Sequence, residues 1–595
     1  MTTPPDGADS PDAAAASPRD VLHRLAGRGG ASAVEALGQV VTEATEIEGF
    51  RPLAECLEWR LADAYWSAAG VLPFVRNDVP YLVNNTGRLS ESAAALVFAA
   101  FDEMHASLPA SFPDRLVILE LGAGTGLYAR YFLDAFAARC RAEKRDYYDR
   151  LVYVVSDRFE RTVAGWQTDG VFAEHGEHAA LRVCDARAPG VLSLPGGARQ
   201  PAGTAPPLPP PLVVFCNYLL DVLPSAIVRR APAGVERLCV RAHVAGGAAA
   251  LRAAGLSSLD EGRALAASGR FADLARLLPL LPHLELETAF LPWTPPPAWE
   301  AEWGAVLPAG DRVIVNDGAL ACLETLVAHV APGGFVLVND YGPVRPEDVA
   351  THLGVQRFGG SVALGLNFSL LGGALARRDV MVAAPDGDDE RRVHTRLVGR
   401  RLGERARQAL SAHFALATDR HLDAPQEEAR QHVTAGRRGE ALAAYRALVE
   451  RNPRDWQMLG EAAEYVGLHL GDHAAGLDIV RAALERNPWY SAWLWNILGD
   501  CLFYREKLDE AHAAFLQARR IDPDDPRANL NLAYTFSARG RQTEALAVLA
   551  HGLAHDGTGA YRPRLLEKQA QILAIVAERA SAERQRLIRR AERFR

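Results

Sequence analysis

Three proline-closed segments in the last third of the chain recur at a fixed distance. The pairs Asn452-Pro453, Asn487-Pro488 and Asp522-Pro523 stand 35 residues apart in both steps. The residues between them have helical periodicity, and because proline cannot continue a helix, each pair closes a unit. A period of about 34 residues is typical of two-helix units that stack on their neighbours. This spacing predicts an all-α solenoid over residues 422–595.

Small and large residues recur inside these units where stacked helices would meet, a pattern that identifies them as tetratricopeptide repeats. The third unit carries the pattern most fully, with Trp495, Leu498, Gly499, Ala511, Phe515, Ala518 and Pro523. The first unit contributes Ala441 and Tyr445, the second is longer by about one residue than the pattern, and the fourth contributes Phe536 and Ala545. Evenly spaced prolines in unrelated helices would not place Gly and Ala at these positions. A helix over 562–595 is expected to cap the stack.

The middle of the chain alternates short apolar runs with longer helical stretches. The runs are 116–121, 151–156, 181–184, 212–216 and 335–339. Continuous apolar strands separated by helices indicate a parallel sheet that is covered on both faces. We therefore predict an α/β fold over 111–391: a doubly wound, mostly parallel, Rossmann-like sheet that ends near residues 380–384.

Composition suggests the remaining boundaries. Residues 1–18 are rich in Pro, Ala, Asp and Ser, which predicts a disordered tail. Residues 19–110 are expected to be mostly helical, with one extended stretch at 79–84. Residues 231–310 look like an insertion with a hairpin at 237–244, and 392–421 are expected to be a helical linker to the repeats.

A glycine-rich turn follows the first strand of the predicted sheet, in the order Glu120-Leu-Gly122-Ala123-Gly124-Thr-Gly126. Glycine there lets a ligand lie against the backbone. The spacing differs from the dinucleotide fingerprint, because Leu127 occupies its last glycine position. Glu120 favours a ligand with a positive end. Such a ligand is S-adenosylmethionine, which has a sulfonium and an ammonium group and no phosphate, and a nicotinamide-dependent enzyme is disfavoured.

Two further acids end the next strands. Asp157 follows the second strand and is positioned to accept hydrogen bonds from both ribose hydroxyls, the alternative being a loop residue or helix N-cap. Asp185 follows the third strand, where either an adenine contact or an N-cap fits. Asn217, Tyr218 and Asp221 follow the fourth strand and, as ligands bind at the carboxyl ends of parallel strands, are expected to face the transferable methyl. Asn217 would bind the amino-acid end of the cofactor or the acceptor. Asp221 would pair with a cationic acceptor or cap the next helix.

These blocks together resemble one family. Glu120-x-Gly-x-Gly-x-Gly, Asn217-x-x-x-Asp221-x-Leu-Pro224 and Pro332-Gly-Gly with Asp340-Tyr-Gly are similar to the MidA-like class I methyltransferases, which are related to the mitochondrial complex I assembly arginine methyltransferase. The resemblance covers about residues 75–385 and implies methyl transfer from S-adenosylmethionine. The chain departs from the family where Tyr218 replaces a glutamate, which puts arginine methylation in doubt.

The combined modules predict a methyltransferase that acts on a protein, with the repeats recruiting the partner. Asn217, Tyr218, Asp221 and Asp340 are the candidate catalytic residues. Of these, the carboxylates of Asp221 and Asp340 would orient a guanidinium and take up its proton. Two alternatives stay open: a non-enzymatic assembly factor that uses the repeats alone, and a methyltransferase for RNA or a small molecule. A lid over 231–310 would suit a small-molecule acceptor.

Charge and cysteine usage limit the other possibilities. The formal net charge is −8, which argues against nucleic acid, and the arginine-rich end of the last helix is interleaved with glutamates. The seven cysteines form no CxxC pair, so we expect no metal site and a reducing, cytoplasmic environment. No apolar run reaches the roughly 20 residues of a membrane helix.

Overall fold

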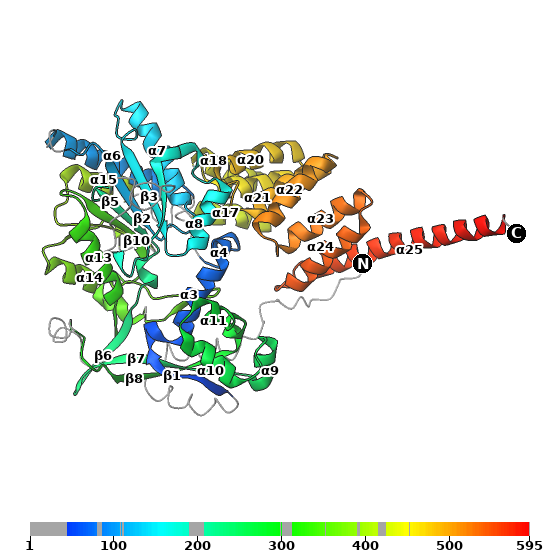
Figure 1. The fold of residues 1–595 in the computed structure, drawn as a ribbon. Coiled ribbons are helices and arrows are strands. Elements are labelled where there is room, and N and C mark those ends of the chain that lie inside the picture. Colours follow the sequence, from blue (N-terminus) through cyan, green and yellow to red (C-terminus); the bar gives the residue numbers. More distant parts are fainter. Residues whose placement is uncertain are drawn as a thin grey trace, which may run out of the picture.

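The structure is a computed structural model that describes residues 44–593, apart from 80–85, 108, 110–111, 190–207, 298, 300–311, 352, 389–392, 415–423 and 452. Figure 1 shows an α/β part, drawn from blue to green, beside a stack of helices drawn from yellow to red. The expected disordered tail and the core of the extended stretch at 79–84 lie outside the described residues.

A seven-stranded sheet forms the centre of the α/β part, in the order β13-β14-β10-β5-β2-β3-β4. Its strands are β2 (Leu116–Leu121), β3 (Leu151–Asp157), β4 (Ala179–Val183), β5 (Val213–Asn217), β10 (Phe335–Tyr341), β13 (Met381–Ala383) and β14 (Val393–Gly399). The five strands from β10 to β4 run parallel, and β14 runs antiparallel to both of its neighbours. The strand order reverses at β2, because the chain passes to β3 on one side and later returns to β5 on the other.

Alternate residues of each strand pack on opposite faces, which accounts for the continuous apolar runs. In β2, Ile118 joins one core cluster, while Val117 and Leu119 join another. The first cluster includes residues of α6 (Arg88–Ser107), α7 (Leu127–Ala142) and α15 (Glu404–Phe414); the second includes residues of α13 (Asp317–His329) and α14 (Phe368–Ala376). Helices thus cover both faces, and the predicted doubly wound, mostly parallel sheet is confirmed.

The expected helical linker at 392–421 was wrong at its beginning. Residues 393–399 are strand β14, which lies between β10 and β13. Its sequence, VHTRLVG, has no long apolar run, and its pairing partner β10 lies about 50 residues earlier in the chain. The only helix described between this strand and residue 421 is α15.

A second, antiparallel sheet lies below the first in Figure 1. Its strands are β1 (Thr45–Pro52), β6 (Ala226–Ala231), β7 (Gly234–Val244), β8 (Leu284–Pro292) and β9 (Arg312–Val315). Strand β1 belongs to the region expected to be mostly helical, and it pairs with β7 of the expected insertion. Helices α3 (Leu57–Ala69), α9 (Gly247–Ala253), α10 (Leu259–Ser268) and α11 (Phe271–Ala275) pack on this sheet through a shared apolar cluster. The N-terminal region and the insertion therefore form one layer over the cavity described below.

Paired helices make up the stack. They are α17 (Ala424–Thr434), α18 (Arg438–Arg451), α19 (Trp456–Glu464), α20 (His473–Arg486), α21 (Ala492–Tyr504), α22 (Leu508–Ile521), α23 (Pro526–Ala538) and α24 (Gln542–His555). Side chains of Asp455, Ser491 and Asp525 cap the first helix of three successive units. The unit that begins with α19 is longer than the one that begins with α21, and a π-helical turn over Tyr465–His469 takes up extra length. The tetratricopeptide repeats are confirmed.

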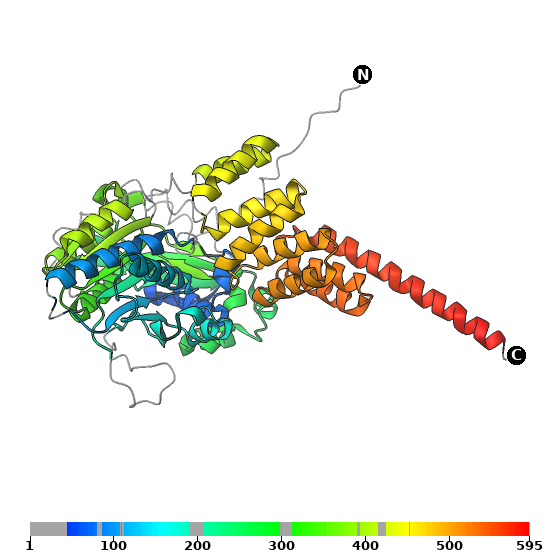
Figure 2. The same cartoon turned by 90° about the horizontal axis from the view of Figure 1, so that it is seen from above.

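The last helix, α25 (Arg562–Glu592), caps the stack only at its beginning. Its buried residues are Leu565 and Ile572. The remainder projects away from the molecule in both views (Figure 1 and Figure 2). None of the described helices is long and apolar enough to cross a membrane.

The repeats dock on the α/β part through a short helix, α4 (Leu72–Val75). Val75 packs against an apolar cluster of α21, α22 and α23 that includes Ala492 and Ile521. The guanidinium of the next residue, Arg76, donates to Asp522 at 2.7 Å and to Asp524 at 2.8 Å. A second contact joins Arg88 to the buried Asp455 at 3.1 Å. The repeats therefore hold a segment of the α/β part in place.

Candidate functional site: a cavity at the carboxyl edge of the sheet

The glycine turn after β2 adopts a conformation that side chains disfavour. Gly122, Gly124 and Gly126 have φ angles of +65°, +56° and +74°. A Cβ on Gly122 would lie 2.7 Å from Leu219, and one on Gly124 would lie 2.9 Å from the ring of Phe74. The side chains of Leu219 and Phe74 therefore pack closely against the backbone of this turn, and helix α7 begins directly after it.

One cavity collects most of the residues predicted as site residues. Its lining includes Glu120, Gly122, Ala123, Gly124, Asp157, Asp185, Asn217, Tyr218 and Asp221. They come from the carboxyl ends of β2, β3, β4 and β5, the edge at which open parallel sheets bind ligands. Gly126 and Asp340 are outside the lining. Gly126 shapes the turn, and Asp340 acts from behind the cavity wall.

A chain of buried hydrogen bonds crosses the sheet beneath the cavity and ends on Glu120. Thr395 donates to Asn339 at 2.8 Å, Asn339 donates to Asn217 at 2.8 Å, and Asn217 donates to Oε1 of Glu120 at 3.0 Å. From the other side, the hydroxyl of Tyr153 donates to Oε2 of Glu120 at 2.9 Å. Since every donor points toward Glu120, the network favours its ionised form.

Burial opposes that ionised form. Burial raises the pKa of Glu120 to about 7, although hydrogen bonds from Asn217 and Tyr153 lower it. Burial likewise raises the pKa of Asp157 to about 6, although hydrogen bonds to the amides of Phe159 and Gly124 lower it. Two carboxyl groups of this kind at one cavity would be stabilised as anions by a cationic ligand.

Asp157 also fixes the glycine turn. Its Oδ2 accepts from the amide of Gly124 at 3.2 Å and its Oδ1 accepts from the amide of Phe159 at 3.1 Å. The indole of Trp166 donates to the carbonyl of Gly124 at 3.0 Å. Each carboxylate oxygen can accept further hydrogen bonds, so this arrangement leaves Asp157 able to bind two hydroxyl groups.

Asp185 is committed to an ion-pair cluster at the edge of the cavity. Its Oδ2 lies 3.1 Å from Nε of Arg158 and 3.0 Å from Nη2 of Arg187. Both arginines also pair with Asp63 of α3, at 2.5 Å and 3.1 Å. The cluster ties the end of β4 to the layer above it. We therefore interpret Asp185 as a wall residue of the cavity.

The cavity lining also includes the carboxyl group of Asp221. It is buried, and its Oδ1 makes no hydrogen bond of normal geometry; the same holds for the hydroxyl of Tyr341, which faces it. Burial raises the pKa of Asp221. Tyr218 has a φ of +47°, a rare conformation for a large side chain that is often found at functional sites.

Asp340 positions the segment that carries Asp221. Its carboxylate accepts from the amides of Leu220 at 3.0 Å, Asp221 at 3.3 Å and Tyr341 at 2.9 Å. Burial and the charge of Asp221 hold the pKa of Asp340 well above its usual value. Asp340 therefore holds the backbone of η5 (Leu220–Val222) in place and does not line the cavity.

Sequence reasoning missed the aromatic roof of the cavity. Trp59 and Trp66 of α3, Phe74 of α4, and Phe159 after β3 line it. Phe74 lies against the glycine turn, while Val75 and Arg76 contact the repeats. No motif marks these residues. The available signal was the amphipathic pattern of α3, which places Trp59 on the buried face of that helix.

Comparison with known protein families identifies the tetratricopeptide repeats. A family model for the tetratricopeptide repeat matches residues 502–572. No curated protein matches the sequence. Among solved structures, a Burkholderia thailandensis protein described as a "likely methyl transferase" bound to S-adenosyl-homocysteine has a TM-score of 0.34 and 16% identity, covering 62% of this chain and 78% of its own. A thermophilic TPR protein of Thermus thermophilus has a TM-score of 0.23 and 25% identity, covering 28% and 91%. Scores this low carry no argument about the chemistry of this chain.

Proposed function

We propose that the cavity binds S-adenosylmethionine and that the chain is a methyltransferase with a repeat domain for a protein partner. One observation carries the proposal. Glu120, Asp157 and Asn217, from the ends of three adjacent strands, meet at one cavity beside a turn of left-handed glycines. The site lies where the strand order reverses, the usual ligand site of such sheets.

The chemistry of the residues fits this cofactor. Its sulfonium and ammonium groups suit the buried carboxyl groups of Glu120 and Asp157, and its ribose diol suits Asp157. The aromatic roof suits its purine. A dinucleotide would require room at the turn for a pyrophosphate, and there the ring of Phe74 lies close to Gly124.

When bound, the cofactor would supply an activated methyl group. The chain itself has to hold an acceptor in line and exclude water, which needs position more than a strong base. Asp221 is the residue best suited to accept an N–H of the acceptor, because it lines the cavity and its Oδ1 makes no hydrogen bond of normal geometry. Asp340 and Tyr341 would position it. We place Tyr218 beside the acceptor.

The acceptor is proposed to be a protein nitrogen. The repeats support this choice, since stacked helix pairs commonly bind peptides. Resemblance to the MidA-like family favours an arginine guanidinium, and Tyr218 in place of the family's glutamate weighs against it. An assembly factor without catalysis is the second candidate, favoured by this same replacement.

Transfer of a labelled methyl group tests the activity. Purified protein is incubated with a proteome and S-adenosylmethionine that carries tritium in its methyl group. The proposal expects a labelled protein band that Asp221→Asn abolishes, with S-adenosylhomocysteine binding retained. The exposed Asp146→Asn is the matched control. No labelled protein, despite cofactor binding, would favour the assembly-factor candidate.

A further inference from the structure

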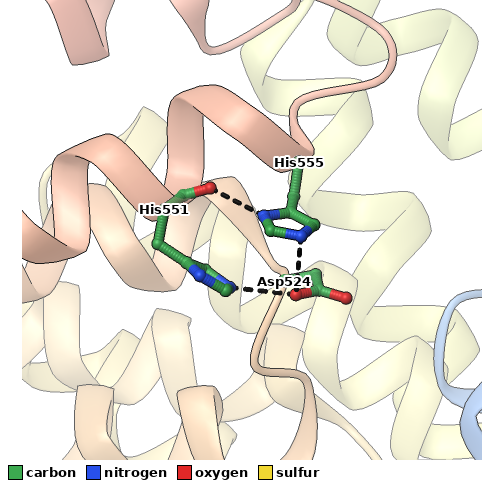
Figure 3. Close-up of side chains that lie close together, drawn as sticks. All are labelled: Asp524, His551 and His555. Atoms are coloured by element: carbon green, nitrogen blue, oxygen red, sulfur yellow. Dashed lines mark hydrogen bonds and ion pairs between the residues drawn. The ribbon is translucent and has the colours of Figure 1, made fainter. Parts of the chain in front are cut away.

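Three potential metal ligands converge in the repeat domain, although cysteine usage predicted no metal site. His551 and His555 are one turn apart on α24, and Asp524 precedes α23 (Figure 3). Nε2 of His551 lies 2.9 Å from Oδ1 of Asp524, and Nε2 of His555 lies 3.6 Å from the same oxygen. The two imidazole rings stack with centroids 4.2 Å apart. Both histidines therefore direct the same ring nitrogen at one carboxylate oxygen.

The hydrogen bond at the other nitrogen of His555 determines what its Nε2 offers. Nδ1 of His555 lies 2.9 Å from the carbonyl oxygen of His551, which can only accept (Figure 3). Nδ1 therefore carries the proton, and in a neutral imidazole Nε2 is then a lone pair. That lone pair faces a carboxylate oxygen, an arrangement that a cation between the two atoms would stabilise. A backbone carbonyl that orients the second ring nitrogen is typical of metal-bound histidine.

Distances and ligand types match one class of ion. Ligands about 2.0–2.2 Å from a tetrahedral zinc lie about 3.3 Å from each other. The observed separations of 2.9 Å and 3.6 Å lie on either side of that value, and all ligand atoms are within 4.8 Å of one another. Asp524 accepts from Arg76 through Oδ2 at 2.8 Å, which leaves Oδ1 facing the two imidazoles for an ion. Imidazole together with a carboxylate suits Zn²⁺ and its neighbours.

We propose that Asp524, His551 and His555 bind a divalent transition-metal ion of the zinc type. The three protein ligands leave a fourth position for water or for a side chain of a partner. His551 and Asp524 are half-buried and His555 is exposed, so the ion can enter from solvent.

The site lies where the repeats meet the α/β part. Oδ2 of Asp524 accepts from Arg76, while its Oδ1 faces the histidines. One carboxylate would thus bind the ion through one oxygen and hold Arg76 through the other. Because Arg76 follows α4, which carries Phe74 at the glycine turn, the ion would stabilise the docking of the repeats next to the cavity.

Metal titration of the full chain tests the proposal. Protein freed of metal with a chelator is titrated with Zn²⁺ by calorimetry and with Co²⁺ by visible absorption. We expect one Zn²⁺ per chain to bind at this site, and Co²⁺ to give the d–d bands of a tetrahedral N/O site. His555→Ala leaves the Arg76 contact intact and should weaken binding by at least about 100-fold, since even outer-shell partners of a metal contribute about 10- to 100-fold. His329→Ala, at an exposed helical histidine, is the matched control.

The double variant His551→Ala/His555→Ala separates this site from any other. We expect it to bind one ion fewer than the wild-type protein, with an unchanged circular dichroism spectrum. Equal binding by wild type and double variant would overturn the proposal. So would a wild-type protein that binds no Zn²⁺.

Discussion

The side-chain amide of Asn217 donates to Oε1 of Glu120 at 3.0 Å, joining the ends of β5 and β2 where the strand order reverses. This hydrogen bond orients the one carboxylate of the glycine motif toward the cavity. It also places Asn217 between Glu120 and Asn339 in the network that crosses the sheet. The proposed cofactor site depends on this arrangement.

Removing Asn217 should therefore destabilise the fold as well as weaken ligand binding. Asn217→Ala leaves a buried acceptor on Glu120 and a buried donor on Asn339 without partners, which costs about 1–3 kcal/mol for each group. Urea unfolding measures the loss. Gln408→Ala, which removes an exposed helical amide, serves as the control. If both variants unfold at the wild-type midpoint, the network does not stabilise the fold.

Cofactor affinity should rise as the pH increases through the pKa values of the buried acids. These are about 7 for Glu120 and about 6 for Asp157, both raised by burial. A raised pKa in the folded state means that the contribution of each group to stability is present at low pH and is lost as the pH rises through the folded value. A bound cationic ligand offsets the free-energy cost of ionising these buried carboxyl groups. Calorimetry with S-adenosylmethionine should show about tenfold weaker binding at pH about 5.5 than at pH about 7.5. Equal affinity at the two pH values would show that ionisation of these carboxyl groups does not contribute to ligand binding.

The repeats should influence the cavity through α4. Arg76→Ala removes the ion pairs with Asp522 and Asp524, so that Phe74 is held less firmly against Gly124. Since Arg76 is about one-third exposed, we expect a stability loss of about 1 kcal/mol and a severalfold weaker affinity for S-adenosylhomocysteine. Arg454→Ala, which breaks an exposed pair with Glu91, is the control. Unchanged affinity in Arg76→Ala would show that the repeats and the cavity are independent.

Helix packing in the stack predicts that a glycine-to-alanine substitution has different effects on stability at two positions. A Cβ on Gly499 would lie 2.3 Å from the ring of Phe515, whereas one on Gly439 of α18 meets nothing within 4 Å. Gly499→Ala should destabilise the protein by about 1–3 kcal/mol through overpacking. Gly439→Ala should be neutral or stabilise it by up to about 1 kcal/mol. Thermal unfolding compares them, and equal melting temperatures would contradict the packing.

Local signals in the sequence were enough for the sheet and for most of the cavity. The glycine turn is a short-range feature, and parallel strands necessarily bring their carboxyl ends to one edge. Glu120, Asp157 and Asn217 could therefore be placed together in advance. Asp340 was harder, because a strand-end position does not decide which way a carboxylate turns, and its oxygens bind the amides of Leu220 and Asp221.

Features that depend on distant pairing were not predictable in this way. Strand β14 has a mixed polar and apolar sequence and becomes a strand through its ladders with β10 and β13. The roof of the cavity depends on α4, whose neighbour Arg76 pairs with Asp522, 446 positions later in the chain. No local pattern reports contacts of that range.

Calorimetric titration with S-adenosylhomocysteine measures whether the cavity binds the proposed cofactor. Wild-type protein is compared with Gly124→Arg, whose side chain would fill the cavity, and with Gly269→Arg. Gly269 has a similar positive φ of +70° but open space around it, so the second variant controls for backbone strain. We expect binding by wild type and Gly269→Arg, and none by Gly124→Arg. A folded wild-type protein that binds no S-adenosylhomocysteine, or a Gly124→Arg variant that binds it as tightly, would show that the cavity is not the proposed cofactor site.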